Sequence, residues 1–263
     1  MHATNTKLQA QAISISMVAK ADSTKTIDTD VDEILRGIHR GRWQQPIQTI
    51  REKFQRVLAD TGDLKAAKLA IDAEKKRLSA ILFSGKFSRR ANDALIQHSG
   101  LLCADLDGLN IELPLVRQKL SESARVFSHF LSPSGDGVKV LFRVPADASR
   151  HVDSFRAISH HVLELTGRQI DGACKDVARL CFASFDPDLY INERAVAIAP
   201  LSQKPKRPLP LQDAADLRLR QRSAVDLLGQ ISWNSDCHGI LPCPGPTKRI
   251  PVLDETQTHG TAR

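Results

Sequence analysis

The sequence has few aromatic residues and no long apolar run. Its 263 residues include one Tyr, two Trp and nine Phe, too few for nucleic-acid recognition by extensive base stacking. No stretch approaches the ~20 apolar residues that a helix needs to cross a bilayer. Residues 1–20 also lack the basic start and the apolar run of a secretory signal. We therefore expect a cytoplasmic protein without a membrane partner.

Cysteine is scarce and sequence repeats are lacking. Five Cys, an odd number, argue against a disulfide scaffold and favour reduced thiols, most of them buried. The sequence shows no repeat of 20–50 residues, which argues against solenoids and propellers. Hydrophobic residues make up 41% of the chain and charged residues 25%, the balance of a globular protein rather than a disordered one.

Basic residues are in excess and are unevenly distributed. Lys and Arg number 37 against 30 Asp and Glu, a net charge of +7. Residues 36–90 alone hold 14 Lys and Arg against 5 Asp and Glu. This excess favours a polyanionic partner such as nucleic acid or nucleotides. A solvated basic helix face is the alternative.

Composition and periodicity divide the chain into four parts. Residues 1–29 contain one alternating strand, AISISMVA, followed by a polar loop. Residues 30–200 form the main domain, which includes the basic helical section. Residues 201–210 have the Pro and Lys/Arg content of a linker, and residues 211–263 combine a basic helix with an irregular, poorly ordered tail.

The main domain alternates between helical and strand patterns. Short loops and a hairpin-like SGDG turn at 134–137 join them, so the sequence predicts an α+β fold rather than a purely parallel sheet. Helical spacing is found at 31–40, 47–60, 64–80, 114–124 and 155–167, and strand patterns at 78–87, 99–109, 124–132, 138–144 and 177–187.

The first candidate site is the pair Asp105 and Asp107 in LLCADLDGL. Side chains two apart on a strand share a face, so the two carboxylates lie close together. Because two adjacent anions repel, a positive group should lie between them. Oxygen ligands of this kind suit Mg²⁺ or Mn²⁺. The alternative is a pair of turn or cap aspartates, because Leu-Asp-Gly is also typical of a turn.

The second candidate is SPSGDGVK, residues 132–139, directly before an apolar strand. Ser134, Gly135 and the backbone amides of such a turn can hold phosphate oxygens, and Lys139 adds a positive charge. The spacing differs from a P-loop and the turn precedes a strand, which argues against a P-loop ATPase. An ordinary β-turn is the alternative.

The third candidate lies in QIDGACKDVARLCFASFDP, residues 169–187. A third carboxylate there would complete a divalent-metal site, and an Arg would pair with a triphosphate. A surface ion-pair cluster is the alternative. The polar and charged residues concerned are Asp171, Lys175, Asp176, Arg179, Ser184 and Asp186.

Together, the three motifs in their order resemble one family. The runs KRLSAILFSGKFSRR, LIQHSGLLCADLDGL, FSHFLSPSGDGVKVLFRV and IDGACKDVARLCFASFDPDLYIN resemble the N-terminal domain of VirE-type (virulence-associated protein E) proteins, a branch of the archaeo-eukaryotic primase superfamily. The resemblance spans roughly residues 10–195. It implies an RRM-like catalytic sheet with flanking helices and two-metal nucleotidyl transfer in DNA replication of a mobile genetic element.

The resemblance also implies roles for individual residues. Asp105, Asp107 and Asp171 match the metal-binding acids, with Asp176 as the alternative third acid. Ser134 and Lys139 match the nucleotide-contacting motif, in which primases of this superfamily typically carry a His in place of the Lys. Arg179 matches the residue that would hold the incoming triphosphate. The implied cofactor is Mg²⁺ or Mn²⁺, and the implied partners are single-stranded DNA, nucleoside triphosphates and a helicase-like ATPase.

Two alternative functions and two expectations about the C-terminal end remain beside this hypothesis. A non-catalytic nucleic-acid- or nucleotide-binding module acting with a helicase-like partner is the alternative to a DNA-directed nucleotidyltransferase, and a metal-dependent nuclease would use similar acids. The C-terminal end resembles the start of a truncated further module. Its thiol and imidazole groups are a candidate Zn²⁺ site, although their spacing differs from the usual paired knuckles; they are Cys237, His238, Cys243 and His259.

Overall fold

The computed structural model describes residues 12–201, which form an α+β fold with antiparallel sheets. The predicted linker beyond residue 201, the basic helix within 211–263 and the candidate zinc ligands lie outside the described residues. Strand β1 (Ser14–Val18) confirms the predicted N-terminal strand. The architecture is built on two four-stranded sheets and one two-stranded sheet.

The central sheet has the order β10-β7-β8-β6. It comprises β6 (Leu101–Leu106), β7 (Val126–Leu131), β8 (Val138–Arg143) and the short β10 (Tyr190–Ile191). All of its pairings are antiparallel. Turn 132–137 joins β7 to β8, so the predicted hairpin is confirmed.

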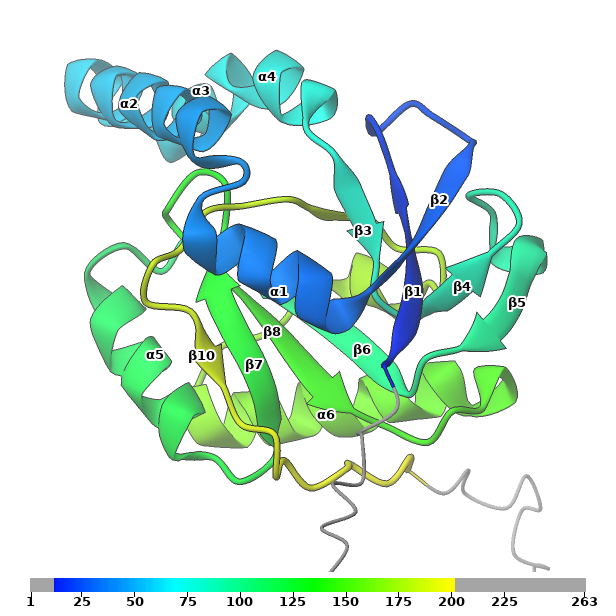
Figure 1. Cartoon of the computed structure of the whole chain (residues 1–263). Helices are drawn as coiled ribbons and strands as arrows, with labels where there is room; N and C mark the ends of the chain where they lie inside the picture. Colours follow the sequence, from blue (N-terminus) through cyan, green and yellow to red (C-terminus); the bar gives the residue numbers. More distant parts are fainter. Residues whose placement is uncertain (1–11, 202–263) are drawn as a thin grey trace, which may run out of the picture. The chain divides into compact units, whose positions relative to one another are not determined.

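Two helices cover one face of this sheet. Helix α5 (Leu113–Glu122) has Pro in its first turn, and α6 (His151–Thr166) ends at Gly167 in the left-handed conformation. Their apolar sides pack on alternate residues of β6, β7 and β8 in one buried cluster. In Figure 1, α6 lies behind the sheet and α1 in front of it.

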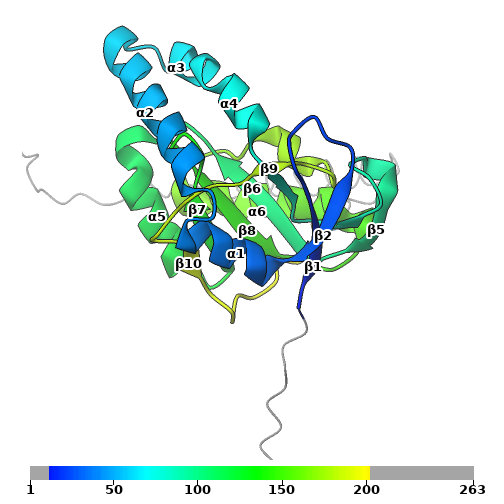
Figure 2. The same cartoon turned by 45° about the horizontal axis from the view of Figure 1, so that its top comes forward.

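The other face of the sheet packs against the N-terminal elements. Helix α1 (Val31–Arg40) begins at Asp30, whose carboxylate accepts a hydrogen bond from the Glu33 amide at 2.7 Å. Helices α2 (Gln44–Thr61), α3 (Leu64–Ala70) and α4 (Asp72–Arg77) follow, with α3 and α4 packed along α2 (Figure 2). The second buried cluster joins these helices to the central sheet; its members include Ile34, Phe54, Ile81, Phe130 and Leu141.

The second sheet has the order β2-β1-β3-β9. Its further strands are β2 (Thr26–Asp30), β3 (Ala80–Leu82) and β9 (Cys181–Phe182). Strands β4 (Gly85–Phe87) and β5 (Leu95–His98) form the two-stranded sheet. Short 3₁₀ segments η1 to η4 lie at Asn92–Ala94, Asn110–Glu112, Ala148–Arg150 and Gly172–Lys175.

Some predicted elements differ from the structure. Residues 26–30, predicted as a loop, form the edge strand β2. The sequence of this strand does not alternate between apolar and polar residues, because Ile27 is its one apolar residue and is exposed. The predicted helix 64–80 is broken at Ile71, which leaves the helical conformation between α3 and α4. The predicted strand 177–187 is reduced to the two residues of β9. Strands β5 and β10 fall outside the predicted strand patterns, because they have only four and two residues, too few to show a period.

Candidate functional site

Asp105 and Lys139 are cross-strand neighbours. They face each other in the β6–β8 register, and both lie on the sheet face that also carries Leu101 and Leu141. The Lys139 ammonium forms an ion pair with Asp105 Oδ2, and the two side chains are only 9% and 13% exposed. Lys139 is therefore the positive group that the acid pair required.

Burial and neighbouring charges act against each other at this pair. Burial alone would lower the pKa of Lys139, but the carboxylates of Asp105 and Asp107 outweigh it and raise that pKa. Lys139 is thus an ammonium at neutral pH. Burial raises the pKa of Asp105, although Lys139 opposes the effect.

Asp107 lies just beyond the end of β6 and is exposed. Although the residue as a whole is exposed, partial desolvation of its carboxylate would raise its pKa, but the charges of Lys139, Lys68 and Lys75 more than offset this and lower it. The turn before β8 packs tightly against this strand end. A Cβ at Gly137 would lie 2.3 Å from the Leu106 carbonyl oxygen and 3.0 Å from Asp107 Cα. Glycine at this position is what allows the turn to support the acid.

Asp171 reaches the same place from a different part of the chain. Its backbone amide donates a hydrogen bond to the Asp105 carbonyl oxygen at 2.9 Å. Its carboxylate caps η4, accepting from the Ala173 amide at 2.9 Å, and pairs with the Arg179 guanidinium at 2.6 Å. The predicted third acid, Asp171, therefore lies next to Asp105. It is paired with Arg179, the residue predicted to bind the triphosphate.

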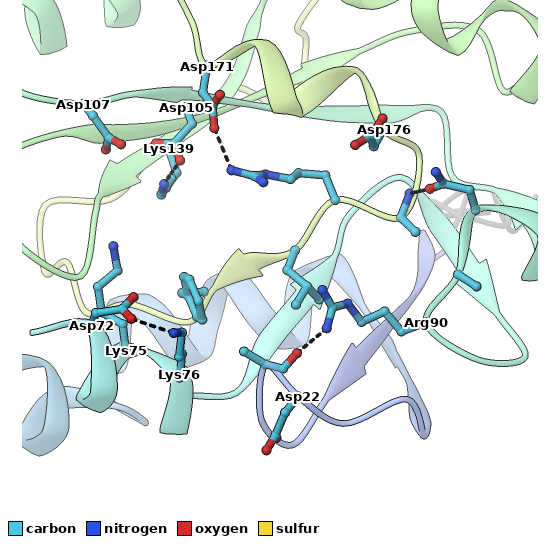
Figure 3. A pocket seen from close by; sticks show the side chains of 17 residues that line it. Asp22, Asp72, Lys75, Lys76, Arg90, Asp105, Asp107, Lys139, Asp171 and Asp176 are labelled. Carbon is cyan, nitrogen blue, oxygen red and sulfur yellow. Dashed lines mark hydrogen bonds and ion pairs between the residues drawn. The ribbon is translucent and has the colours of Figure 1, made fainter. Parts of the chain in front are cut away.

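These residues line one pocket of about 720 Å³. Figure 3 shows Asp105, Asp107, Lys139 and Asp171 on one side of it. Across the pocket lie charged side chains from α4, from the β1–β2 turn and from the segment after β4. They are Asp22, Asp72, Lys75, Lys76 and Arg90. Asp176 and Arg179 also line the pocket, so six of the nine predicted site residues meet there.

Lys75 is a site residue that sequence reasoning missed. It extends from α4 toward the acidic wall (Figure 3), and its ammonium lies 5.6 Å from the centroid of the Phe182 ring. Burial, followed by the charge of Lys139, lowers the pKa of Lys75. Its only signal in the sequence was membership of the basic segment 36–90, which does not single out one lysine.

Three predicted residues lie elsewhere. Ser134 is buried and hydrogen-bonded to Asp136 within the turn. Gly135 adopts a φ of +78° and lies against the Arg51 side chain. Lys175 is exposed, and neither it nor the two turn residues line the pocket. A nucleotide contact by these three residues stays a prediction.

The donor chemistry of the acidic wall fits Mg²⁺ or Mn²⁺ in part. Asp105, Asp107 and Asp171 supply carboxylate oxygens, and the buried Asp105 Oδ1 has no hydrogen-bond partner. Within residues 12–201, however, no three Asp, Glu, His or Cys side chains are gathered closely enough to hold an ion together. Lys139 already pairs with the other oxygen of Asp105. A divalent cation would therefore enter a wall that already holds a positive charge.

Three thiols lie beside the ion pair. Cys103, Cys174 and Cys181 line a small cavity with Asp105 and Lys139, and all three are free. Burial raises the pKa of Cys174 to about 12, which makes it a poor nucleophile at neutral pH. These thiols serve as packing around the charged pair, as expected for reduced cysteines.

Comparison with known proteins gives one match. Residues 73–191 match the family model described as BT4734-like, N-terminal domain. The matched stretch runs from α4 through β10 and contains all nine residues of the predicted metal- and nucleotide-binding site, but not the candidate zinc ligands. No curated protein and no solved structure matches the chain. None of the helices in the described part of the chain has the length and apolar character to span a membrane.

Proposed function

We propose that this chain is a primase-polymerase-like nucleotidyltransferase domain, of the VirE-type and with an RRM-like core, that acts on single-stranded DNA in a mobile genetic element. One observation carries the proposal. Carboxylates from β6 and from the start of η4 lie on one wall of a pocket whose other residues include Lys75, Lys76, Arg90 and Arg179. Acids beside several cations suit a metal–triphosphate substrate, in which both charges occur.

The residues divide the work of such a reaction between them. Asp105, Asp107 and Asp171 would hold Mg²⁺ or Mn²⁺, which when bound activates a 3′-hydroxyl and neutralises charge on the phosphates. Lys75 and Arg179 would bind triphosphate oxygens. Asp171 orients Arg179 through their 2.6 Å contact, so the acid also positions a phosphate ligand.

A basic surface beyond the pocket suits the template. The segment 36–90, which includes α2, α3 and α4, carries the chain's largest basic excess. Binding of single-stranded DNA there would rest on phosphate contacts, and its affinity would fall as salt rises. The scarcity of aromatic residues fits such sequence-tolerant binding.

Incorporation of labelled nucleotides tests the enzyme. We would supply NTPs or dNTPs, a single-stranded template and Mg²⁺ or Mn²⁺, and compare the wild type with the double variant Asp105→Asn, Asp107→Asn. The matched control is Asp28→Asn, which removes an acid paired with Lys86 at 2.8 Å, away from the pocket. Product from the wild type and the control, but not from the double variant, supports a nucleotidyltransferase.

A non-catalytic nucleotide- or nucleic-acid-binding module is the second candidate. The ion pair between Lys139 and Asp105 favours it, because an acid that is already paired with a lysine is less available to a metal ion, while the cations of the pocket can bind phosphates without turnover. In that case no protein would form product, and the double variant would bind DNA and nucleotide as well as the wild type. Loss of binding would follow instead from replacing Lys75 or Arg179.

A further inference from the structure

We propose that Lys139 is a built-in counter-ion that keeps Asp105 closed to divalent cations in the nucleotide-free protein. The inference rests on the proposed function, because it concerns the cation that the acidic wall would take during nucleotidyl transfer. Lys139 would then control when Asp105 can bind a metal ion, in addition to any contact that it makes with phosphate.

Lys139 is held in place by the sheet. It lies within β8, which is hydrogen-bonded to β6 on one side and to β7 on the other. Its side chain is nine-tenths buried, and its ammonium is directed to the carboxylate of its cross-strand neighbour Asp105. The ammonium of a surface lysine is mostly hydrated, whereas that of Lys139 is largely removed from water and paired with this carboxylate.

The charge balance of the wall then opposes a free metal ion. Asp105 and Lys139 together are neutral, and a divalent cation bound to Asp105 would meet an ammonium at close range in a poorly solvated place. One Asp105 oxygen is engaged by Lys139, while the other is buried without a partner. The Asp105–Lys139 pair therefore keeps one acceptor oxygen in reserve but adds no net negative charge that would attract an ion.

A nucleotide would change this balance. A triphosphate adds several negative charges to a pocket that already holds Lys75 and Arg179, and it can carry a divalent cation with it. Metal and nucleotide would then favour each other's binding, a coupling that is reciprocal by thermodynamic necessity. The Asp105–Lys139 pair would thus keep a metal ion from binding before the nucleotide does.

Titration with Mn²⁺ alone, without nucleotide, tests this role by the loss of the free-ion electron paramagnetic resonance signal. We expect the wild type to bind Mn²⁺ weakly and Lys139→Met to bind it at least about tenfold more tightly. The double variant Asp105→Asn, Lys139→Met should lose that gain. Lys53→Met is the matched control, since it breaks a partly buried ion pair with Glu74 outside the pocket and should behave as the wild type.

Removing Lys139 leaves Asp105 without its counter-ion, so folding needs its own readout. Mn²⁺ should raise the Tm of Lys139→Met and leave that of the wild type unchanged, because a ligand stabilises the state that binds it. Lys139→Gln, which keeps a hydrogen-bond donor for Asp105, provides a second variant and should show the same gain.

Two results would overturn the proposal. One is Mn²⁺ binding by the wild type as tight as by Lys139→Met or Lys139→Gln. The other is a folded variant that gains no affinity. Failure of the proposed function is separate: a wild type that incorporates no nucleotide, while Lys139→Met still gains Mn²⁺, would remove the enzyme and leave the counter-ion role intact.

Discussion

The backbone amide of Asp171 donates a hydrogen bond to the carbonyl oxygen of Asp105 at 2.9 Å. This bond joins the start of η4 to β6 and brings the third acid beside the first. Because the tether is made by main-chain atoms, the position of Asp171 does not depend on its own carboxylate. Side-chain substitutions there can therefore test chemistry separately from structure.

Asp171 and Asp176 should differ sharply in importance. Asp171→Asn keeps the backbone tether and the capping oxygen but removes the charge, so we expect nucleotide incorporation to fall about 100-fold or more. Asp176→Asn, at the exposed pocket rim, should change it less than about threefold. Steady-state incorporation assays on both proteins, with circular dichroism as the folding check, measure this. The opposite ranking would make Asp176 the third acid.

Lys75 should contribute to triphosphate binding. Lys75→Met removes one phosphate ligand from the pocket wall, so KM for the nucleotide should rise about tenfold while kcat stays within about threefold. Lys119→Met, on α5 and outside both the pocket and the basic segment 36–90, is the control and should leave both parameters unchanged. An unaltered KM in Lys75→Met would show that α4 does not hold the triphosphate.

Gly137 should be intolerant of a side chain. Its added Cβ would lie 2.3 Å from the Leu106 carbonyl oxygen, so Gly137→Ala should lower the free energy of unfolding by about 1–3 kcal/mol. Gly172→Ala is the matched control, because a Cβ there meets no atom within 4 Å. Its effect should be neutral or slightly stabilising. Urea denaturation of the two variants measures the difference, and equal stabilities would contradict the tight packing at Asp107.

Acid should destabilise the protein through two buried histidines. Burial lowers the pKa of His129 and of His151 from 6.5 to about 4. The charge of Arg117 adds to the effect at His129, and His98 adds to it at His151. The unfolded chain therefore takes up protons below pH 6.5 that the folded protein accepts only near pH 4, so stability falls as pH decreases through this window. Each histidine should lower the free energy of unfolding by about 2 kcal/mol at pH 5 relative to neutral pH.

Urea denaturation at pH 7.5 and pH 5 checks this dependence. His129→Gln and His151→Gln should each show a smaller loss between the two pH values than the wild type. His160→Gln, at an exposed helix position, should show the same loss as the wild type. Equal pH dependence in all four proteins would mean that other groups cause the acid sensitivity.

The sequence predicted those parts of the site that rest on local periodicity. The two-residue period of a strand is enough to set the face of β6 on which Asp105 lies, although Asp107 falls just beyond the end of the strand, and the SGDG turn is enough to pair β7 with β8. The β7–β8 hairpin places Lys139 on a strand of the sheet, but it does not say which strand lies on the other side of β8. The alignment of Lys139 with Asp105 depends on that strand being β6. Periodicity carries no information about the order of strands in the sheet.

Other features depend on contacts between distant segments. The turn at Ser134 has the composition of a phosphate-binding loop, yet Arg51 of α2 packs against it at Gly135. The Ser134 hydroxyl is hydrogen-bonded within the turn, to Ser132 and Asp136. Lys75 becomes a pocket residue only because α4 follows a break at Ile71 and packs near Phe182. Such outcomes are set by tertiary packing, which a single sequence does not encode in a readable local pattern.

The Asp105–Lys139 pair also constrains how the strands align while the chain folds. A slip of one residue in β6 or β8 would exchange the two faces of that strand and turn a charge into the apolar layer around Leu102, Val140 and Phe142. An unpaired carboxylate or ammonium in that layer costs several kcal/mol. The two side chains that would act on the substrate therefore also destabilise misaligned sheets. Replacing both with apolar residues would remove this energetic penalty as well as the chemistry.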